Sequence, residues 1–443
     1  MNDGMKQAHL LFHFMTDRKS TLVAAAVLAV AGVYLLLRRR RNRRARAAAA
    51  TRPPICLHFD VNETIMLGDP AGGDTFEDSL NKVIAKTAFV KRVPPESQTR
   101  AGRDSRWSGY MWHDGTPLDP DARREAGLEG SPAPPLLDVF ADVPEGCVRF
   151  YDVPELKRAY AKTFTSDGSP GYVYRGTLDE MRRAMRWPDG LPRDERLCEK
   201  DGHYTILPAF FQVLATLRAS RRPFSVVVRT FGSDVPRVID AIDAFCEGKH
   251  PRFPGVLAPE LAIPPERTWL GRYSRDDGSF TLVSNPTGAD PRDGGGLPRL
   301  DAASASAPAL AEDAMLAELQ GGLGTLPRLS AVQDDYEWWR SHGYEPASGK
   351  PLWLTLRDPE GWRHVFFDDN IHAKPHDSIV AVRMRRTPAE AFTPLSGEAT
   401  MDLHGSVLRK VPTVKAVCDI DWFLREIEAC DASIDELCTP MLA

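Results

Sequence analysis

The chain has 443 residues, enough for one large or two ordinary domains. Its hydrophobic content of 42% and charged content of 26% are typical of a globular protein and argue against disorder throughout the chain. Charge is unevenly divided, because residues 1–50 carry a net charge of +8 while the whole chain carries −5. Residues 51–443 are therefore acidic, which argues against nucleic-acid binding by that part.

The seven cysteines are scattered and include no CxxC pair. They stand at positions 56, 147, 198, 246, 418, 430 and 438. This spacing predicts neither a disulfide framework nor a zinc site, and it favours reduced thiols in a cytosolic compartment.

Residues 20–37 form the longest uncharged apolar stretch, with 18 positions free of charge. As a helix they would reach about 27 Å at about 1.5 Å per residue, just enough for the core of a bilayer. Seven arginines follow within residues 38–46, on the wrong side for a cleaved signal peptide. We therefore expect a transmembrane anchor at 20–37, preceded by a tail at 1–19 and followed by a basic juxtamembrane linker at 38–54.

The distribution of basic residues also predicts the orientation. Three Lys or Arg residues precede the apolar stretch and seven Arg residues directly follow it, which places the C-terminal bulk in the cytosol. The basic run at 38–46 is expected to contact anionic lipid headgroups. An endomembrane and the outer mitochondrial membrane both fit this pattern.

The stretch ICLHFDVNETI, residues 55–65, predicts the first strand of the soluble part. Ile55 to Phe59 are apolar enough for a strand buried on both faces. Asp60 then stands at the carboxyl end of the strand, where the ligand crevice of an open α/β sheet lies. Its carboxylate is a candidate for metal binding or for attack on phosphorus, the alternative being a cap for the following turn.

A helix is expected after the loop at 68–74. Thr75 and Asp78 resemble a capping box, and apolar residues then recur at helical spacing. From about 93 to 200 the sequence predicts an irregular region. Its aromatic residues Trp107, Tyr110 and Trp112 could line a substrate surface, but the core of a loop-rich insert is the favoured interpretation.

The next segments alternate between helix and strand. We expect helices at 205–219 and after Ser233, separated by a buried strand at 224–228 that ends in Arg229 and Thr230. Further strands are expected at 269–270 and 280–283. Residues 284–330 are rich in Gly, Ala, Ser and Pro, and we interpret them as a flexible insert.

Structure is expected to resume at 334–345 and 349–356. A strand at 364–372 carries Asp368 and Asp369, another follows at 378–384, and an amphipathic helix closes the chain. Helix and strand in alternation predict an α/β fold with a doubly wound parallel sheet.

The predicted strands place polar side chains at equivalent ends. Asp60, Thr230 and the pair Asp368 and Asp369 should converge on one crevice, because parallel strands share an edge at their carboxyl ends. Carboxylates from separate strands suit Mg²⁺. The hydroxyl of Thr230 can bond a phosphoryl oxygen, and Lys350 can neutralise charge there.

These motifs resemble the haloacid dehalogenase (HAD) superfamily. DVNET is similar to its first motif, DxDxT, with Asn62 in place of the second Asp; SVVVRT is similar to its second motif, and VFFDD to its fourth. The third motif is a lone basic residue, for which Lys350 is the choice and Arg340 the alternative. DVNETI, RTFG and FFDDN further resemble membrane-anchored HAD-like proteins of protists and algae. DVNETI is also similar to DLDETL of the polymerase C-terminal-domain phosphatases, which lack so large an insert.

The resemblance implies a HAD-like domain over residues 55–443 with a Rossmannoid core, and a cap insert at 70–200 that closes over substrate. Asp60 would attack a phosphorylated small molecule or phosphoprotein and form an aspartyl-phosphate. Mg²⁺ would be held by Asp60, the backbone carbonyl of Asn62 and Asp368, with Asp369 as a further ligand.

Asn62 is the departure from the family pattern. In the family the second Asp acts as general acid and base, and an amide cannot, which removes a contribution of about 10²–10⁴ in rate. Glu63 and His372 are alternative bases, although a solvated loop residue or a supporting hydrogen bond is the favoured interpretation of both. The competing hypothesis is a catalytically inactive HAD-like binding or scaffold module tethered to a membrane.

Overall fold

A computed structural model describes residues 52–68, 73–93, 109–137, 143–284, 310–321, 327–374 and 377–441. Of the two units into which the chain divides, the second consists of residues 53–217 with 223–443 and is compact. The anchor predicted at 20–37 and the basic run at 38–46 lie outside the described residues. Among the residues that are described, none belongs to a helix with the length and apolar character that a membrane span requires.

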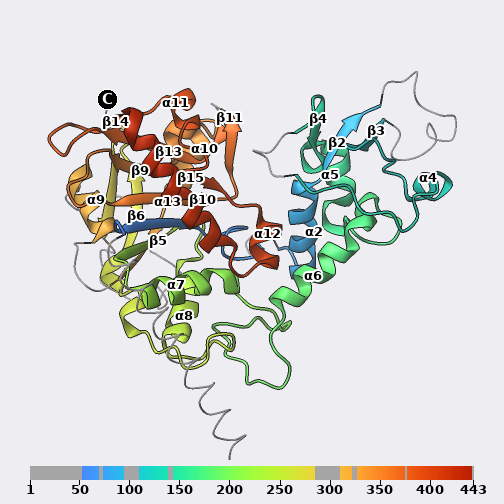
Figure 1. The fold of residues 1–443 in the computed structure, drawn as a ribbon, viewed down its shortest axis with the longest axis horizontal. Helices are drawn as coiled ribbons and strands as arrows, with labels where there is room; N and C mark the ends of the chain where they lie inside the picture. Colours follow the sequence, from blue (N-terminus) through green and yellow to red (C-terminus); the bar gives the residue numbers. More distant parts are fainter. Residues whose placement is uncertain are drawn as a thin grey trace, which may run out of the picture. The chain divides into compact units, whose positions relative to one another are not determined.

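A central sheet of seven strands organises the second unit (Figure 1). Its strand order is β15-β10-β1-β5-β8-β6-β7. The strands are β1 (Ile55–Asp60), β5 (Phe224–Thr230), β6 (Thr268–Tyr273), β7 (Phe280–Ser284), β8 (Arg328–Gln333), β10 (Arg363–Asp368) and β15 (Leu408–Lys410). Neighbours pair in parallel except β6 and β7, which are antiparallel. The fold is thus mixed α/β with a sheet that is mostly parallel, consistent with a Rossmann-like core.

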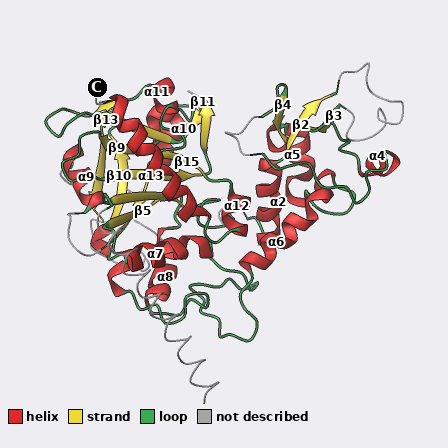
Figure 2. Cartoon of the chain, in the orientation of Figure 1, coloured by secondary structure: helices red, strands yellow, loops and turns green. Residues whose placement is uncertain are grey.

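Helices cover both faces of this sheet (Figure 2). They include α7 (Pro208–Ser220), α8 (Val235–Cys246), α9 (Glu312–Gln320) and α13 (Trp422–Met441). On one face, Phe59 packs edge-on against Phe210 of α7 and Phe423 of α13. On the other face, the thiol of Cys56 contacts the backbone of Leu319 in α9. Strand β1 is buried along its whole length because its alternate side chains enter two different cores.

A second sheet has three strands, one of which covers most of the strand predicted at 378–384. It contains β9 (Lys350–Thr355), β13 (Val380–Arg385) and β14 (Thr393–Pro394). β9 and β13 pair in parallel, and Trp353 of β9 belongs to the core on the α9 face of the central sheet. The strand predicted at 378–384 thus exists as β13, and the segment 349–356, predicted only to be structured, contains β9; neither joins the central sheet.

The region predicted as irregular, about 93 to 200, contains regular elements, so that prediction is wrong in part. The insert between β1 and α7 includes α2 (Phe76–Thr87), β2 (Phe89–Arg92), β3 (Tyr110–Trp112), α4 (Pro120–Glu125), β4 (Cys147–Arg149), α5 (Pro154–Tyr160) and α6 (Arg175–Met185). The capping box at Thr75 and Asp78 is confirmed. Trp112 is fully buried against Phe150, Phe164 and Tyr174, which confirms its assignment to a core. Trp107 lies outside the described residues.

The flexible insert predicted at 284–330 is also wrong in part. Residues 312–320 form α9, which buries Met315, Leu316 and Leu319, and residue 328 begins strand β8. The low-complexity composition of the flanking sequence hid both elements, because a nine-residue helix and a six-residue strand give little periodicity.

Candidate functional site

The carboxyl ends of three adjacent strands bring the predicted site residues together. Asp60, Thr230 and Asp368 are the last residues of β1, β5 and β10. β1 lies between the other two strands, with Phe59 opposite both Val228 and Phe367 in register. Asp60 and Asp368 therefore stand at the same level, and Thr230 stands one residue further along β5, at the edge of the sheet that the sequence predicts.

Lys350 reaches this edge from the second sheet. Its Nζ lies 2.5 Å from Asp60 Oδ1 and 2.8 Å from Asp368 Oδ2, and its side chain is fully buried. The backbone holds it there, because Lys350 donates its N–H to Ile379 O over 2.7 Å. A Cβ on the preceding Gly349 would stand 2.1 Å from Ile379 O, so only glycine permits this close approach.

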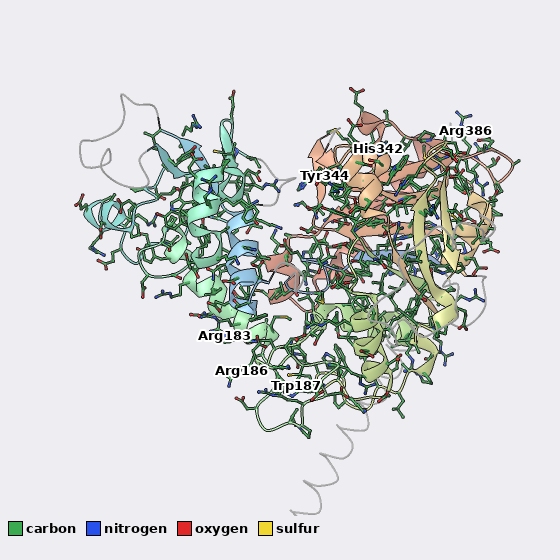
Figure 3. The ribbon with its side chains drawn as sticks, turned by 180° about the vertical axis from the view of Figure 1, so that it is seen from behind. Arg183, Arg186, Trp187, His342, Tyr344 and Arg386 are labelled. Carbon is green, nitrogen blue, oxygen red and sulfur yellow. The ribbon has the colours of Figure 1, made fainter. Side chains whose placement is uncertain are left out.

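Arg340, the alternative basic residue, does not occupy this position. It lies on α10 (Tyr336–Ser341), where it pairs with Glu337 and has a side chain that is 55% exposed. The helix continues into the turn that carries His342 and Tyr344, both labelled in Figure 3. Of the two candidates, Lys350 is the one that contacts Asp60 and Asp368.

The site carries an excess of buried negative charge. Burial raises the pKa of Asp60 to about 7, and the carboxylate of Asp368 adds to the rise while Lys350 opposes it. Burial and then the charge of Glu63 raise the pKa of Asp369 well above its ordinary value. Burial alone would lower the pKa of Lys350, but Asp368 and Asp60 outweigh it and raise that pKa. Lys86 opposes the rise in the pKa of Asp369, so the ammonium groups of Lys350 and Lys86 together do not offset burial and the repulsion among the neighbouring carboxyl groups.

Asp369 completes a set of possible cation ligands. One carboxylate oxygen from each of Asp60, Asp368 and Asp369 lies within 4.8 Å of the others. Asp369 Oδ1 accepts a hydrogen bond from Asn370 Nδ2 over 3.0 Å, and its Oδ2 lies 4.0 Å from Lys86 Nζ. Hard oxygen donors with surplus negative charge fit Mg²⁺, the ion that the sequence predicts.

Asn62 is engaged with an aspartate that the sequence does not single out. Its Nδ2 donates to Asp234 Oδ2 over 3.1 Å, whereas its Oδ1 is buried with no hydrogen-bond partner among the described residues. Asp234 precedes α8 directly and stands four residues after Thr230. Its position after the end of strand β5 is the feature of the sequence that could have identified Asp234. The sequence instead predicts Ser233 as the helix cap, whereas the structure has Asp234 at the N-cap of α8.

Thr230 is tied into the same turn. Its Oγ1 accepts the N–H of Gly232 over 2.8 Å and lies 3.5 Å from Asp234 Oδ2. The hydroxyl therefore keeps its proton available for a weak contact with Asp234 or for a stronger acceptor that enters the site.

The alternative bases Glu63 and His372 have other partners. Glu63 forms an ion pair with Lys86. His372 is buried, with Nδ1 3.4 Å from the Nζ of Lys410, and Lys410 also donates to the backbone oxygen of Asp369. Both residues lie beside the site. The ion pair of Glu63 and the contact of His372 with Lys410 agree with the favoured interpretation, in which neither residue acts as the base.

A cavity of about 240 Å³ adjoins Asp369. Its cationic lining residues are Lys86, Arg149, Lys157 and Lys410, the first three of which come from the insert between β1 and α7. Three acidic residues, Glu63, Asp152 and Asp369, also line the cavity, and Glu63 and Asp152 pair with Lys86 and Arg149. The lining therefore carries one more cation than carboxyl groups, which suits a ligand with negative charge of its own.

Comparison with protein-family models, curated proteins and solved structures found no match to this chain. The chemistry of the site is therefore inferred from its own residues.

Proposed function

We propose that the chain is a HAD-like, Mg²⁺-dependent phosphohydrolase that acts through an aspartyl-phosphate on Asp60. The observation that carries this proposal is the bridge from Lys350 Nζ to Asp60 Oδ1 and Asp368 Oδ2, at 2.5 and 2.8 Å. Three segments far apart in the sequence supply a nucleophile, a cation and a ligand carboxylate at one sheet edge. The motif resemblance assigns the same residues to these roles.

The acidic cluster is suited to hold the metal ion. Asp60, Asp368 and Asp369 would bind Mg²⁺ together with the backbone carbonyl of Asn62, and the bound ion would neutralise charge on the phosphoryl group. Lys350 orients the Asp60 carboxylate, and Thr230 can donate its hydroxyl proton to a phosphoryl oxygen.

In the first step, the free oxygen of the Asp60 carboxylate would attack phosphorus and the bond from phosphorus to the leaving-group oxygen would break. In the second, water would attack the same phosphorus and release inorganic phosphate, which regenerates the carboxylate. Both steps need a proton transfer that Asn62 cannot perform. Asp234 contacts Asn62 and has a carboxylate at the same turn, so it is the residue that we assign to this transfer.

The insert at 70–200 is proposed to act as the cap, and the cationic cavity beside Asp369 supports a phosphorylated substrate, either a small molecule or a phosphoprotein. Residues 20–37 are proposed to anchor the protein to an endomembrane or the outer mitochondrial membrane as a single-pass protein. The HAD-like domain would then face the cytosol, with residues 38–46 on anionic lipid.

The second candidate function is a HAD-like binding or scaffold module without turnover. The observation that favours it is the hydrogen bond from Asn62 Nδ2 to Asp234, which uses the amide where the family has a titratable carboxyl group. A panel of phosphoesters assayed with and without Mg²⁺ separates the two. Turnover that Asp60→Asn abolishes supports the enzyme, and a silent panel despite demonstrated Mg²⁺ binding supports the binding module.

A further inference from the structure

A second group of potential metal ligands lies inside the core, away from the carboxylate edge. Cys56 and His58 alternate on β1 and face the α9 side of the sheet, and His364 stands opposite Cys56 on β10. The Sγ of Cys56 lies 3.5 Å from His58 Nε2, and that nitrogen lies 3.3 Å from His364 Nδ1. All three side chains are buried.

These separations match the edges of a tetrahedral zinc site. With Zn–N bonds of about 2.0–2.1 Å and Zn–S bonds of about 2.3 Å, tetrahedral angles place two nitrogens about 3.3–3.4 Å apart and nitrogen and sulfur about 3.5–3.6 Å apart. Two of the three pairs of ligand atoms therefore already have the separation of a tetrahedral zinc site, and all three atoms lie within 4.8 Å of one another. We propose that Cys56, His58 and His364 bind Zn²⁺, with a fourth position left to a small ligand.

The surroundings suit metal binding. A turn of the Gln320 side-chain amide on α9 would give His364 an outer partner. Gln320 Nε2, a donor, lies 3.0 Å from His364 Nε2, and the exchanged amide oxygen would accept the N–H that a metal-bound His364 carries on Nε2. Metal-binding histidines commonly have such a partner, which fixes the orientation of the ring.

The ligand types separate this site from the carboxylate cluster. Thiolate and imidazole prefer zinc-class ions, whereas the oxygen ligands of Asp60, Asp368 and Asp369 prefer Mg²⁺. A zinc ion there would join β1 to β10, the two strands that end in Asp60 and Asp368. It would act on the fold and take no part in phosphoryl transfer, so the inference does not depend on the proposed function.

The test uses purified full-length protein with saturating Mg²⁺ and one equivalent of Co²⁺ as a spectroscopic substitute for Zn²⁺. We expect a near-ultraviolet sulfur-to-cobalt charge-transfer band and the visible bands of tetrahedral cobalt, both displaced by Zn²⁺. Cobalt bound only by carboxylates gives no sulfur band. A wild-type protein that shows no such band, and whose melting temperature does not respond to Zn²⁺, would overturn the proposal in favour of a hydrogen-bonded Cys–His–His cluster.

Matched variants locate the site. Cys56→Ser should abolish the charge-transfer band, while Cys430→Ser should retain it, since Cys430 is equally buried and likewise contacts a backbone oxygen. Gln320→Ala should weaken Zn²⁺ affinity by about 10–100-fold while keeping the band at saturation. Persistence of the band in Cys56→Ser would overturn the assignment.

Discussion

The amide of Asn62 donates to Asp234 Oδ2 over 3.1 Å, so an aspartate stands directly beside the position where the HAD motif has its second Asp. Asp234→Asn should therefore slow wild-type turnover of p-nitrophenyl phosphate while leaving a small initial burst. The burst persists because p-nitrophenolate needs little protonation to leave, whereas hydrolysis of the aspartyl-phosphate needs a base. Stopped-flow assays measure both phases. Unchanged steady-state turnover in Asp234→Asn would exclude the role that we assign to Asp234.

Substitutions at Asn62 and Asp234 together test which of the two positions needs the carboxylate. Asn62→Asp alone gives residues 60–64 the DxDxT pattern that they resemble but sets two carboxylates side by side, which raises the pKa of at least one of them. The double variant Asn62→Asp/Asp234→Asn keeps one amide and one carboxylate with their positions exchanged. We expect this double variant to turn over faster than Asp234→Asn alone, by up to the roughly 10²–10⁴ that general acid–base catalysis contributes, because the carboxylate then stands at position 62. Asp60→Asn in the same background should abolish both phases, and activity that survives it would refute the nucleophile assignment.

Lys350 should be essential to stability as well as activity. Lys350→Met leaves Asp60 and Asp368 buried without their shared counter-charge, which should cost about 3–5 kcal/mol of unfolding free energy. Urea unfolding at pH 7 measures the loss, and saturating Mg²⁺ should recover part of it. Arg340→Met is the matched control, because its exposed pair with Glu337 should contribute nothing measurable. Equal losses of unfolding free energy in the two variants would contradict the role of Lys350 as the shared counter-charge of Asp60 and Asp368.

Mg²⁺ should raise the melting temperature of the wild-type protein, because an ion that binds only the folded site stabilises it by mass action. Asp368→Asn should remove most of that response by deleting a ligand carboxylate, whereas Glu337→Gln, on exposed helix α10, should preserve it. Thermal scans across a Mg²⁺ titration measure the shift. A full response in Asp368→Asn would mean that the ion binds elsewhere.

His250 should make stability depend on pH. Burial, with Arg252 contributing, lowers its pKa to about 3, while the unfolded chain titrates near about 6.5. The unfolded state binds the proton first as pH falls, so stability is complete above about pH 6.5 and is lost as pH drops towards 3. Between pH 7 and 5, the stability difference between wild type and His250→Gln should narrow by roughly 2 kcal/mol.

The proposed anchor predicts resistance to extraction. If residues 20–37 cross a bilayer, full-length protein in membranes should stay in the pellet after carbonate treatment, while a chain that lacks residues 1–50 should be released. Protease added to intact organelles should digest the acidic domain if that domain faces the cytosol. Recovery of the full-length protein in the carbonate wash would refute the anchor, and complete protection from protease would reverse the orientation.

The sequence by itself determined the main strands and their polar ends. Ile55–Phe59 and Val365–Phe367 are continuous apolar runs, which are typical of strands buried on both faces. The aspartate directly after each run indicates the carboxyl edge of a parallel sheet. The capping box at Thr75 was equally readable, because it depends on residues only three apart. These are local signals, and the structure confirms the elements that they predict.

Tertiary structure alone decided which side chains meet. Lys350 and Asp60 are 290 positions apart, and the close packing of Gly349 against Ile379 brings the ammonium to the carboxylate. The contact between Asn62 and Asp234 and the approach of Cys56 to His364 likewise depend on which strands are neighbours. No periodicity along the chain encodes these pairs, because strand order and register arise from packing among segments that are distant in sequence.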